Sequence, residues 1–287
     1  MPRSVVWSLY AFLVLIWSST WVAIKIGLDD LPPLFGAGIR FALAGLVLLG
    51  GAALARRSLR TDARLATILA VLPFALTYGL VYWAEQHITS GLTAVLFGML
   101  PLYTALLAAI ALPEEPLRRR LLVGIGLAIA GLALAFNESL ELGDDELAGV
   151  AALAAVLSSL PSAIGSVSIK LRGAALDALV LNGWAMLAAG VVLLAASAPS
   201  EDWGAAAWTA ESIGSIAYLA LLGTAATFVG LTLLLREMTA VATSFISVLI
   251  PFGALAFGAL LENEVVTGTA ILGAALVAAG IAVAASG

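Results

Sequence analysis

Ten apolar stretches, each about as long as a membrane-crossing helix, follow one another along the 287-residue chain. Hydrophobic residues make up 62% of the chain and charged residues 11%, so its helices lack the polar outer faces that a water-soluble helical protein needs. The stretches run over residues 5–27, 34–55, 65–84, 91–111, 121–136, 147–169, 178–197, 213–235, 241–261 and 268–286. We therefore predict an all-α integral membrane protein with ten transmembrane helices.

Lysine and arginine residues predict the orientation of these helices, because basic residues are retained preferentially on the cytoplasmic side. With the N-terminus in the cytoplasm, the inner segments hold eleven of the thirteen basic residues and the outer segments hold none. The eleven are Arg3, Arg56, Arg57, Arg60, Arg64, Arg118, Arg119, Arg120, Lys170, Arg172 and Arg236. Both termini are therefore expected in the cytoplasm.

An internal repeat divides the chain into two halves. The segment from Glu115 to Gly131 aligns without a gap on the segment from Glu264 to Gly280, at an offset of 149 residues. Pro101 matches Pro251 at an offset of 150, and Lys25 matches Lys170 at 145. Chance similarity between alanine-rich helices is the alternative, but the markers keep one order and nearly one offset. We predict repeats over 1–140 and 141–287, and because five spans is an odd number, the second is inverted in the membrane.

Two motifs carry a resemblance to a known family. The opening "LIWSSTWVAIKIGL" (15–28) and "PPLFGAGIRFALAGLVLL" (32–49), with a glutamate and a glycine-rich helix ending each half, resemble the EamA-type drug/metabolite transporter superfamily. Within it, the similarity is greatest to bacterial amino-acid exporters of the YddG kind. The resemblance implies a multi-pass carrier of the bacterial inner membrane that moves amino acids, other small metabolites or cationic drugs outward. The chain departs from the common family pattern at Ser18 and Thr20, and the second-half segment "LPSAIGSVSIK" lacks the aromatic pair.

A substrate site is expected near the midplane, where the repeats of a duplicated transporter meet. Trp17, Trp21 and Lys25 are spaced by four and share one face of the first helix. Their equivalents in the second half, at an offset of 145 residues, are the polar residues Ser162, Ser166 and Lys170. This predicts a wall of aromatic side chains from one half opposite a wall of hydroxyl groups from the other. The candidate substrate-binding residues are Trp17, Thr20, Trp21, Tyr78, Tyr82, Ser158, Ser162, Ser166 and Ser244. Ordinary helix packing is the alternative for these positions, and the interfacial aromatic belt is a second one for Tyr82.

Such a lining suits a small amphipathic solute, because aromatic faces accept apolar and cationic groups while hydroxyls replace lost water. We predict export of amino acids by alternating access. The acidic residues lie in loops or near the ends of spans, so a facilitator is expected. The alternatives are an exporter of cationic drugs or other amphipathic metabolites, and a proton-coupled antiporter.

Other classes of protein have less support from the sequence. A membrane enzyme needs a set of catalytic residues, and we find none in the sequence. If the chain were a structural or receptor protein, sealed vesicles containing it would show no flux of solute. We expect no cofactor, no metal and no nucleic acid, and as partners only the small-molecule substrate and the lipid bilayer.

Charged residues and helix breakers complete the candidate sites. Lys25, Arg40, Glu85 and His87 lie at one level and predict an outer polar cluster, acting as a gate or by mutual neutralisation. Pro101 and Pro251, flanked by Gly98 and Gly253, predict paired mid-span hinges, with static kinks as the alternative.

Structural roles in capping and packing are predicted for a further set of residues at the start of the last helix of each half and within it. Glu115 and Glu264 are expected to cap the last helix of each half. The glycines of those helices predict close packing, namely Gly124, Gly126, Gly131, Gly273 and Gly280.

Overall fold

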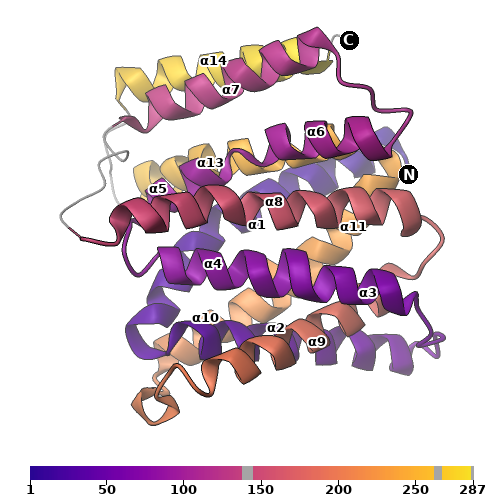
Figure 1. The fold of residues 1–287 in the computed structure, drawn as a ribbon, viewed down its shortest axis with the longest axis vertical. Coiled ribbons are helices and arrows are strands. Elements are labelled where there is room, and N and C mark those ends of the chain that lie inside the picture. The colour runs from indigo at the N-terminus through magenta and orange to yellow at the C-terminus, as the bar shows by residue number, and fades with distance from the viewer. Residues whose placement is uncertain (138–144, 262–266, 286–287) are drawn as a thin grey trace.

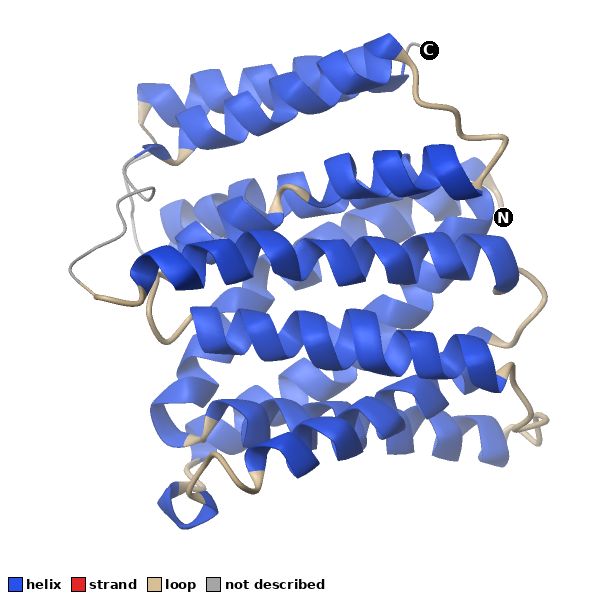
Figure 2. Cartoon of the chain, in the orientation of Figure 1, coloured by secondary structure: helices blue, strands red, loops and turns tan. Residues whose placement is uncertain are grey.

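The computed structural model describes residues 1–137, 145–261 and 267–285, and the regular elements within these ranges are helices (Figure 2). The α-helices of the first half are α1 (Arg3–Asp30), α2 (Pro33–Leu54), α3 (Ala63–Leu69), α4 (Thr77–Ala84), α5 (Ser90–Phe97), α6 (Leu100–Ala111) and α7 (Arg119–Ala135). Those of the second half are α8 (Ala148–Arg172), α9 (Ala178–Ser197), α10 (Ala210–Ala220), α11 (Thr227–Glu237), α12 (Ala240–Ser244), α13 (Ile246–Leu261) and α14 (Gly268–Ala285). Two π-helical segments, η1 (Ala70–Leu76) and η4 (Leu221–Ala226), and the short 3₁₀-helix η3 (Trp203–Ala205) join them.

Eight helical segments of the described chain are long and apolar enough to cross a membrane. Five are single helices, namely α1, α2, α8, α9 and α14, and three are built from consecutive helices, namely α3–η1–α4, α5–α6 and α10–η4–α11. The predicted spans 121–136 and 241–261 correspond to α7, which has 17 residues, and to the shorter apolar stretch Ala240–Ala254 in α12 and α13. The structure confirms an all-helical protein with multiple apolar spans, whereas the count of ten stays a prediction.

Large apolar side chains remain exposed on the outward faces of these helices. Val22, Val191 and Ile271, from three different helices, keep 60%, 60% and 62% of their surface exposed. Water would penalise such surfaces, but lipid tails do not. The exposed faces therefore fit a helical bundle surrounded by lipid.

The bundle has two chemically different ends, which we call the basic end and the acidic end. At the basic end, Arg57 forms an ion pair with Asp177 at 2.8 Å, and the N-terminal ammonium pairs with Glu237 at 2.7 Å. Helix α14 also finishes there, so the described chain begins and ends on one side (Figure 1). At the opposite, acidic end, the Thr209 hydroxyl donates a hydrogen bond to Asp30.

Helices that the sequence repeat makes equivalent pack against each other, and α2 with α9 is the first such pair, at the bottom of Figure 1. A Cβ atom placed on Gly45 would lie 2.5 Å from the backbone nitrogen of Leu187 in α9. The relation is mutual, because a Cβ atom on Gly190 would lie 2.5 Å from the backbone nitrogen of Ala42 in α2. Glycines on both helices therefore allow their backbones to touch.

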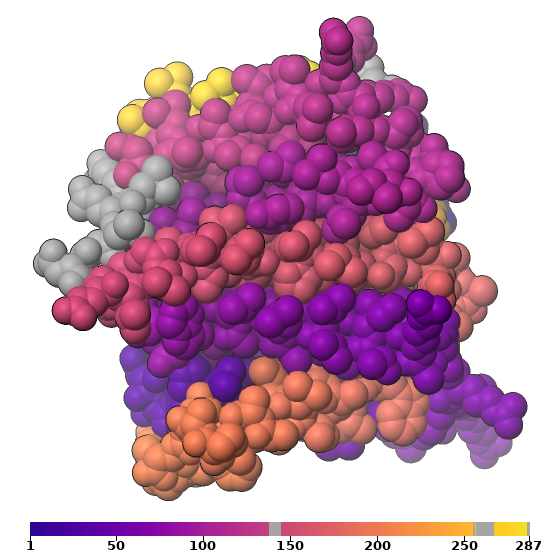
Figure 3. Space-filling model, in the orientation of Figure 1, coloured from indigo at the N-terminus to yellow at the C-terminus, as the bar shows by residue number. Residues whose placement is uncertain are grey.

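The second pair, α7 with α14, forms the top layer of Figure 1. A Cβ atom on Gly124 would lie 2.5 Å from the carbonyl oxygen of Gly280, and one on Gly131 would lie 2.6 Å from that of Gly273. The prediction of close packing is confirmed for these four glycines. It is wrong for Gly126, which has open space beside it because it points away from α14. In Figure 3, α6, α8 and α4 follow one another as bands between α7 of the upper pair and α9 of the lower pair.

The predicted hinge prolines occupy different positions in their helices. Gly98 and Met99 separate α5 from α6, so Pro101 lies in the first turn of α6. Pro101 lies in the middle of the span Ser90–Ala111, as predicted, but it removes no hydrogen bond from α6, because a first-turn N–H has no intrahelical partner to lose. Pro251 does lie inside its helix, α13. Only the second proline therefore removes a hydrogen bond from the interior of a helix.

The two glycines predicted to flank these hinges are sites of close packing. A Cβ atom on Gly98 would collide with the Leu132 side chain of α7, and one on Gly253 would collide with the Ser18 side chain of α1. Their small size is therefore explained by contact with another helix. A contribution to bending stays a prediction.

Carboxylates from one part of the chain cap helices from another. Both oxygens of Glu115 accept a hydrogen bond from the backbone N–H of Ala240 in α12, at 3.0 and 2.9 Å. The prediction that Glu115 caps the following helix, α7, is wrong, because its loop carries the carboxylate to α12 instead. Glu201 caps α2 at the acidic end in the same way, accepting from two backbone N–H groups at 2.8 and 2.9 Å. Glu264 lies outside the described residues.

Candidate functional site

Four aromatic side chains surround a cavity of about 40 Å³ beside the middle of α1, and we call it the aromatic cavity. Its lining residues are Trp17, Thr20, Trp21, Ile24, Thr77, Tyr78, Val81, Phe97 and Ile250. Four of the predicted substrate-binding residues therefore meet around one cavity, with three contributed by α1 and Tyr78 by α4. The proximity of the first-helix stripe to the third span is as expected, whereas substrate binding stays a prediction.

Ring contacts hold the walls of the aromatic cavity in place. Trp17 packs edge-on against Phe228 of α11 with ring centroids 5.4 Å apart, and Phe228 also lies 6.2 Å from the Tyr78 ring. Trp21 meets Phe97 of α5 edge-on at 6.3 Å. Because such edge-to-face contacts favour defined geometries, the cavity has walls from several spans with fixed orientations.

The π-helical segment η4 supplies a carbonyl group to this region. The Trp17 indole donates from Nε1 to the carbonyl oxygen of Gly223 at 3.2 Å, and the Arg40 guanidinium donates to the same oxygen at 3.4 Å. A π-helical turn widens the usual hydrogen-bond pattern and is frequent at functional sites. In this protein the widened turn presents its carbonyl to two side chains from other spans.

Arg40 is buried in the middle of this group, with 1% of its surface exposed. Its Nε donates to the Thr224 hydroxyl at 2.7 Å, and one terminal nitrogen donates to the Tyr82 hydroxyl at 3.2 Å. The guanidinium carbon lies 4.8 Å from the centre of the Tyr78 ring, a distance typical of cation–π attraction. Tyr82, 4% exposed, is therefore a buried partner of Arg40. The interfacial-belt explanation does not hold for it, nor does it line the aromatic cavity.

The predicted hydroxyl wall does not face the aromatic wall. Ser158, Ser162 and Ser166 lie on α8, which packs against α4, α5, α6 and η1, whereas α1 packs against α13, α10 and α11. The Ser158 hydroxyl donates to a carbonyl of its own helix, Ala155 O, at 2.7 Å. Ser244 likewise donates to a carbonyl of its own helix. None of these four serines lines the aromatic cavity.

The predicted outer polar cluster is also not formed as a set of contacting residues. His87 pairs with Asp145 at 3.1 Å, and Lys25 is exposed near the end of α1. Arg40 turns inward to its neutral partners instead of toward His87. Hydrogen bonds from the Leu147 backbone and from His87 hold the pKa of the Asp145 carboxyl below its usual range.

Glu85 immediately follows the span that ends at Ala84, and its carboxylate is buried. Neither of its oxygens has a hydrogen-bond partner within the part of the chain that the structure describes. Burial raises the pKa of Glu85 from its ordinary value of 4.5 to about 8, and the nearby Ser90 hydroxyl and the charges of Lys25 and Arg40 offset only part of this effect. The carboxyl group is therefore mostly protonated at neutral pH.

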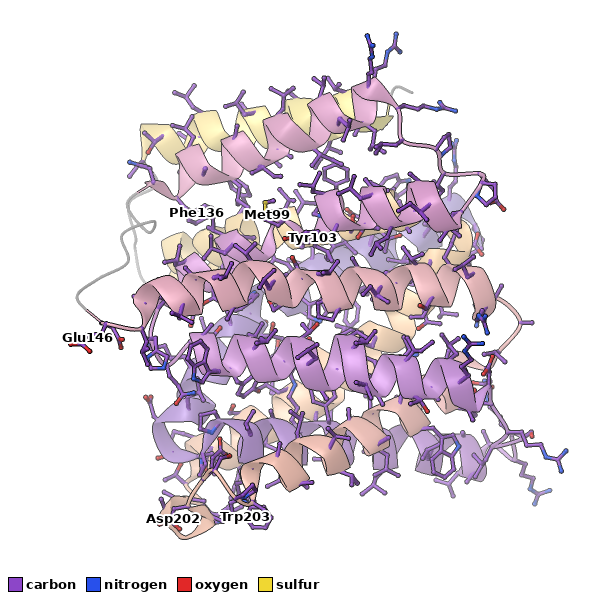
Figure 4. All side chains as sticks on the ribbon, viewed as in Figure 1. Met99, Tyr103, Phe136, Glu146, Asp202 and Trp203 are labelled. Atoms are coloured by element: carbon purple, nitrogen blue, oxygen red, sulfur yellow. The ribbon has the colours of Figure 1, made fainter. Side chains whose placement is uncertain are left out.

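A much larger cavity, of about 580 Å³, lies at the basic end. It is bounded by α1, α12, α13 and α14 and by the α6–α7 loop. Its lining residues are Trp7, Tyr10, Glu114, Glu115, Pro116, Arg118, Leu121, Met238, Thr239, Val241, Ala242, Phe245, Leu249, Ile281, Ala284 and Ala285. Met99, Tyr103 and Phe136 lie beyond it, between the α7 layer and α6 (Figure 4).

Sequence reasoning missed four residues that shape this site: Gly223 and Thr224 of η4, Phe228 of α11 and Phe97 of α5. All but Phe97 come from the eighth apolar stretch, 213–235. That stretch has no charged residue and no tryptophan, two of the residue types from which the site was predicted. One available signal was the unpaired Arg40, because a cation in a span needs nearby oxygen atoms or aromatic faces.

Comparison with known proteins places these features in a family. The sequence profile of the EamA-like transporter family matches residues 5–137 and again residues 149–286. The uncharacterized transporter YoaV of Bacillus subtilis is 30% identical over 246 residues, which cover 85% of this chain and 84% of YoaV. The uncharacterized inner membrane transporter YedA of Escherichia coli K12 is 32% identical over 237 residues, covering 81% and 75% of the two chains.

Two more distant similarities concern substrate and fold. An S-adenosylmethionine/S-adenosylhomocysteine transporter of Chlamydia trachomatis is 29% identical over 196 residues, covering 66% of this chain and 60% of that protein. A crystal structure with 18% sequence identity superposes with a TM-score of 0.83 over 99% of this chain and 97% of the other. The second similarity supports the fold alone.

Proposed function

Because the chain belongs to the EamA-like transporter family, we propose that it exports amino acids and related small metabolites across the bacterial inner membrane by alternating access. The aromatic cavity is the observation that carries this proposal. It combines apolar faces with the Thr20 and Thr77 side chains in the middle of the bundle, which is a suitable lining for a small amphipathic solute.

Substrates with an amino-acid group have further support from one relative. S-adenosylmethionine and S-adenosylhomocysteine, named for the Chlamydia protein, both contain an α-amino carboxylate. The aromatic walls accept the apolar part of such a molecule, and the faces of Trp17 and Tyr78 attract its ammonium group. Cationic drugs and other amphipathic metabolites are the alternative substrates, because the same walls accept them.

The proposed topology has ten spans in two inverted repeats, 1–140 and 141–287, with both termini in the cytoplasm. The position of both chain ends at the basic end of the bundle supports it (Figure 1), since cytoplasmic segments collect lysine and arginine. The large cavity then lies on the cytoplasmic side and the aromatic cavity lies deeper, so the two occupy successive depths of a transport path.

A facilitator remains the proposal for energy coupling, but Glu85 favours proton coupling as a second candidate. Its buried carboxyl group carries a pKa of about 8, so its protonation changes near physiological pH. A group that gains and loses a proton at one end of the bundle can couple proton movement to the conformational cycle. Transport by such a protein responds to a pH gradient.

Transport by purified protein in proteoliposomes tests the proposal. Vesicles preloaded with an unlabelled mixture of amino acids should accumulate labelled amino acids by exchange, and Trp17→Ala should reduce this signal at least about tenfold. Trp208→Ala is the matched control, because Trp208 is 54% exposed at the acidic end. Absence of exchange for every amino acid, with the protein folded, would refute amino-acid transport.

The same vesicles decide between facilitator and proton coupling. With equal amino acid on both sides, an imposed pH gradient should cause no accumulation by a facilitator. Accumulation that Glu85→Gln abolishes would establish the proton-coupled alternative.

A further inference from the structure

We propose that Arg40 recognises a carboxylate on the transported molecule, so that the protein selects zwitterionic or anionic solutes over simple cations. The inference rests on the proposed function and narrows its substrate class. Its basis is the position of a buried cation among neutral partners, between the aromatic cavity and a small crevice.

The first observation is the burial of the charge itself. Arg40 lies two turns inside α2, and only 1% of its surface is exposed. Guanidinium groups remain charged at physiological pH, and a buried charge without compensation is costly. An arginine buried at this position is therefore expected either to take part in function through its charge or to be neutralised by an ion pair.

No ion pair neutralises it within the described residues. The carboxylates in residues 1–137, 145–261 and 267–285 all lie farther than 4.0 Å from the Arg40 nitrogens. Its partners there are the hydroxyls of Thr224 and Tyr82, the Gly223 carbonyl and two aromatic rings. The nearest acidic influence, Glu85, is mostly protonated at neutral pH, so it adds little negative charge.

The guanidinium also keeps unused hydrogen-bonding capacity. It has five N–H groups, and the structure gives it three hydrogen bonds, of which two are long at 3.2 and 3.4 Å. Two N–H groups therefore have no partner among the described residues and can donate to an incoming acceptor. A carboxylate matches this requirement, because its two oxygens accept from adjacent N–H groups of a guanidinium in a fork.

The location of Arg40 gives a transported molecule access to it. Arg40 and Tyr82 line a small crevice of about 10 Å³ toward the acidic end, and Ile24 lines both this crevice and the aromatic cavity. Tyr78, whose ring lies against the guanidinium, lines the aromatic cavity. The crevice has room for about one water molecule, so a carboxylate reaches Arg40 only when the helices that line the crevice move apart during the transport cycle.

A matched pair of probes tests the inference without leakage through lipid. Phenylalanine betaine and phenethyltrimethylammonium carry the same ring and the same permanent ammonium charge, and they differ in the carboxylate. In proteoliposomes, the wild type should take up the betaine with a kcat/KM about 10- to 100-fold higher, the range for hydrogen bonds to charged groups. Arg40→Gln should abolish this preference, and Arg172→Gln, which removes an exposed cation at the end of α8, should retain it.

Each outcome decides a different statement. Equal uptake of both probes by the wild type, or an unchanged preference in Arg40→Gln, overturns the role of Arg40 and leaves amino-acid transport intact. Uptake of neither probe, together with absence of amino-acid exchange, overturns the proposed function as well. If Arg40→Gln does not reach the membrane folded, Arg40→Lys keeps the charge but loses the fork, and its preference should fall below that of the wild type. An undiminished preference in Arg40→Lys then overturns the inference.

Discussion

Glu85 provides a quantitative test of the structure, because a buried carboxyl group links the stability of the protein to pH. Its pKa is raised from 4.5 to about 8 in the folded protein. Each pKa unit corresponds to about 1.36 kcal/mol, so the full difference between folded and unfolded states is at most about 5 kcal/mol. Replacing Glu85 by Gln removes this titration while keeping the shape of the side chain.

The sign of the effect follows from where the proton is held. Below pH 4.5 the carboxyl group is protonated in both states, and its contribution to stability is complete. Between pH 4.5 and 8 only the unfolded state loses the proton, so the free energy of unfolding falls by about 1.4 kcal/mol per pH unit. From about pH 5 to 7.5, the wild type should therefore lose about 3 kcal/mol relative to Glu85→Gln.

Thermal unfolding followed by tryptophan fluorescence measures this difference, since the chain has seven tryptophans. The apparent Tm of the wild type should fall toward that of Glu85→Gln, or below it, as the pH rises at a fixed heating rate. Glu146→Gln, at the same end of the bundle and exposed (Figure 4), is the control and should follow the wild type. Parallel pH profiles for wild type and Glu85→Gln would refute the burial of a protonated carboxyl group.

Three further predictions concern the site, the helix breaks and the packing. Trp17→Ala should lower transport strongly while the protein stays folded, and normal exchange in proteoliposomes would contradict the role of the aromatic cavity. Pro251→Ala should shift labelling between the two sides of the membrane because it restores a hydrogen bond inside α13, whereas Pro101→Ala should not, and equal shifts for both would contradict this distinction. Gly45→Ala should destabilise the protein by about 1–3 kcal/mol because its Cβ meets the α9 backbone, whereas Gly50→Ala, with open space beside it, should not lower the Tm.

The sequence predicted those features that the lipid environment itself imposes. Apolar runs must be long enough to cross the membrane, so the spans around Trp17 and Tyr78 were predictable. The glycines at 124 and 131 were predictable as well, because close helix contacts in lipid require small residues. Both features depend on short stretches of sequence, so they can be predicted without knowing how the helices pack.

Features that depend on helix rotation and distant partners were not predictable in this way. The serine stripe of α8 was expected opposite Trp17 on the assumption that equivalent helices face each other across the site. The equivalent spans that meet are α2 with α9, α7 with α14, and α5–α6 with α12–α13. Helix α8 packs mainly against α4, α5 and α6, and its serines do not line the aromatic cavity. The partners of Arg40 at Gly223 and Thr224 lie more than 180 residues away in the chain. They also lie in a π-helical turn that no hydrophobic period reveals.

The mutual contacts between equivalent helices have a consequence for how the two parts of this chain are held together. When Gly45 receives the backbone of α9 and Gly190 receives that of α2, the contact is isologous, the self-complementary kind that joins the subunits of a two-fold homodimer. The covalent connection between the halves keeps them at high effective concentration but contributes nothing to the fit of the surfaces. Each half is thus the docking partner of the other. A substitution on the contact face of α2 must therefore remain compatible with the equivalent face of α9, and the reverse holds as well.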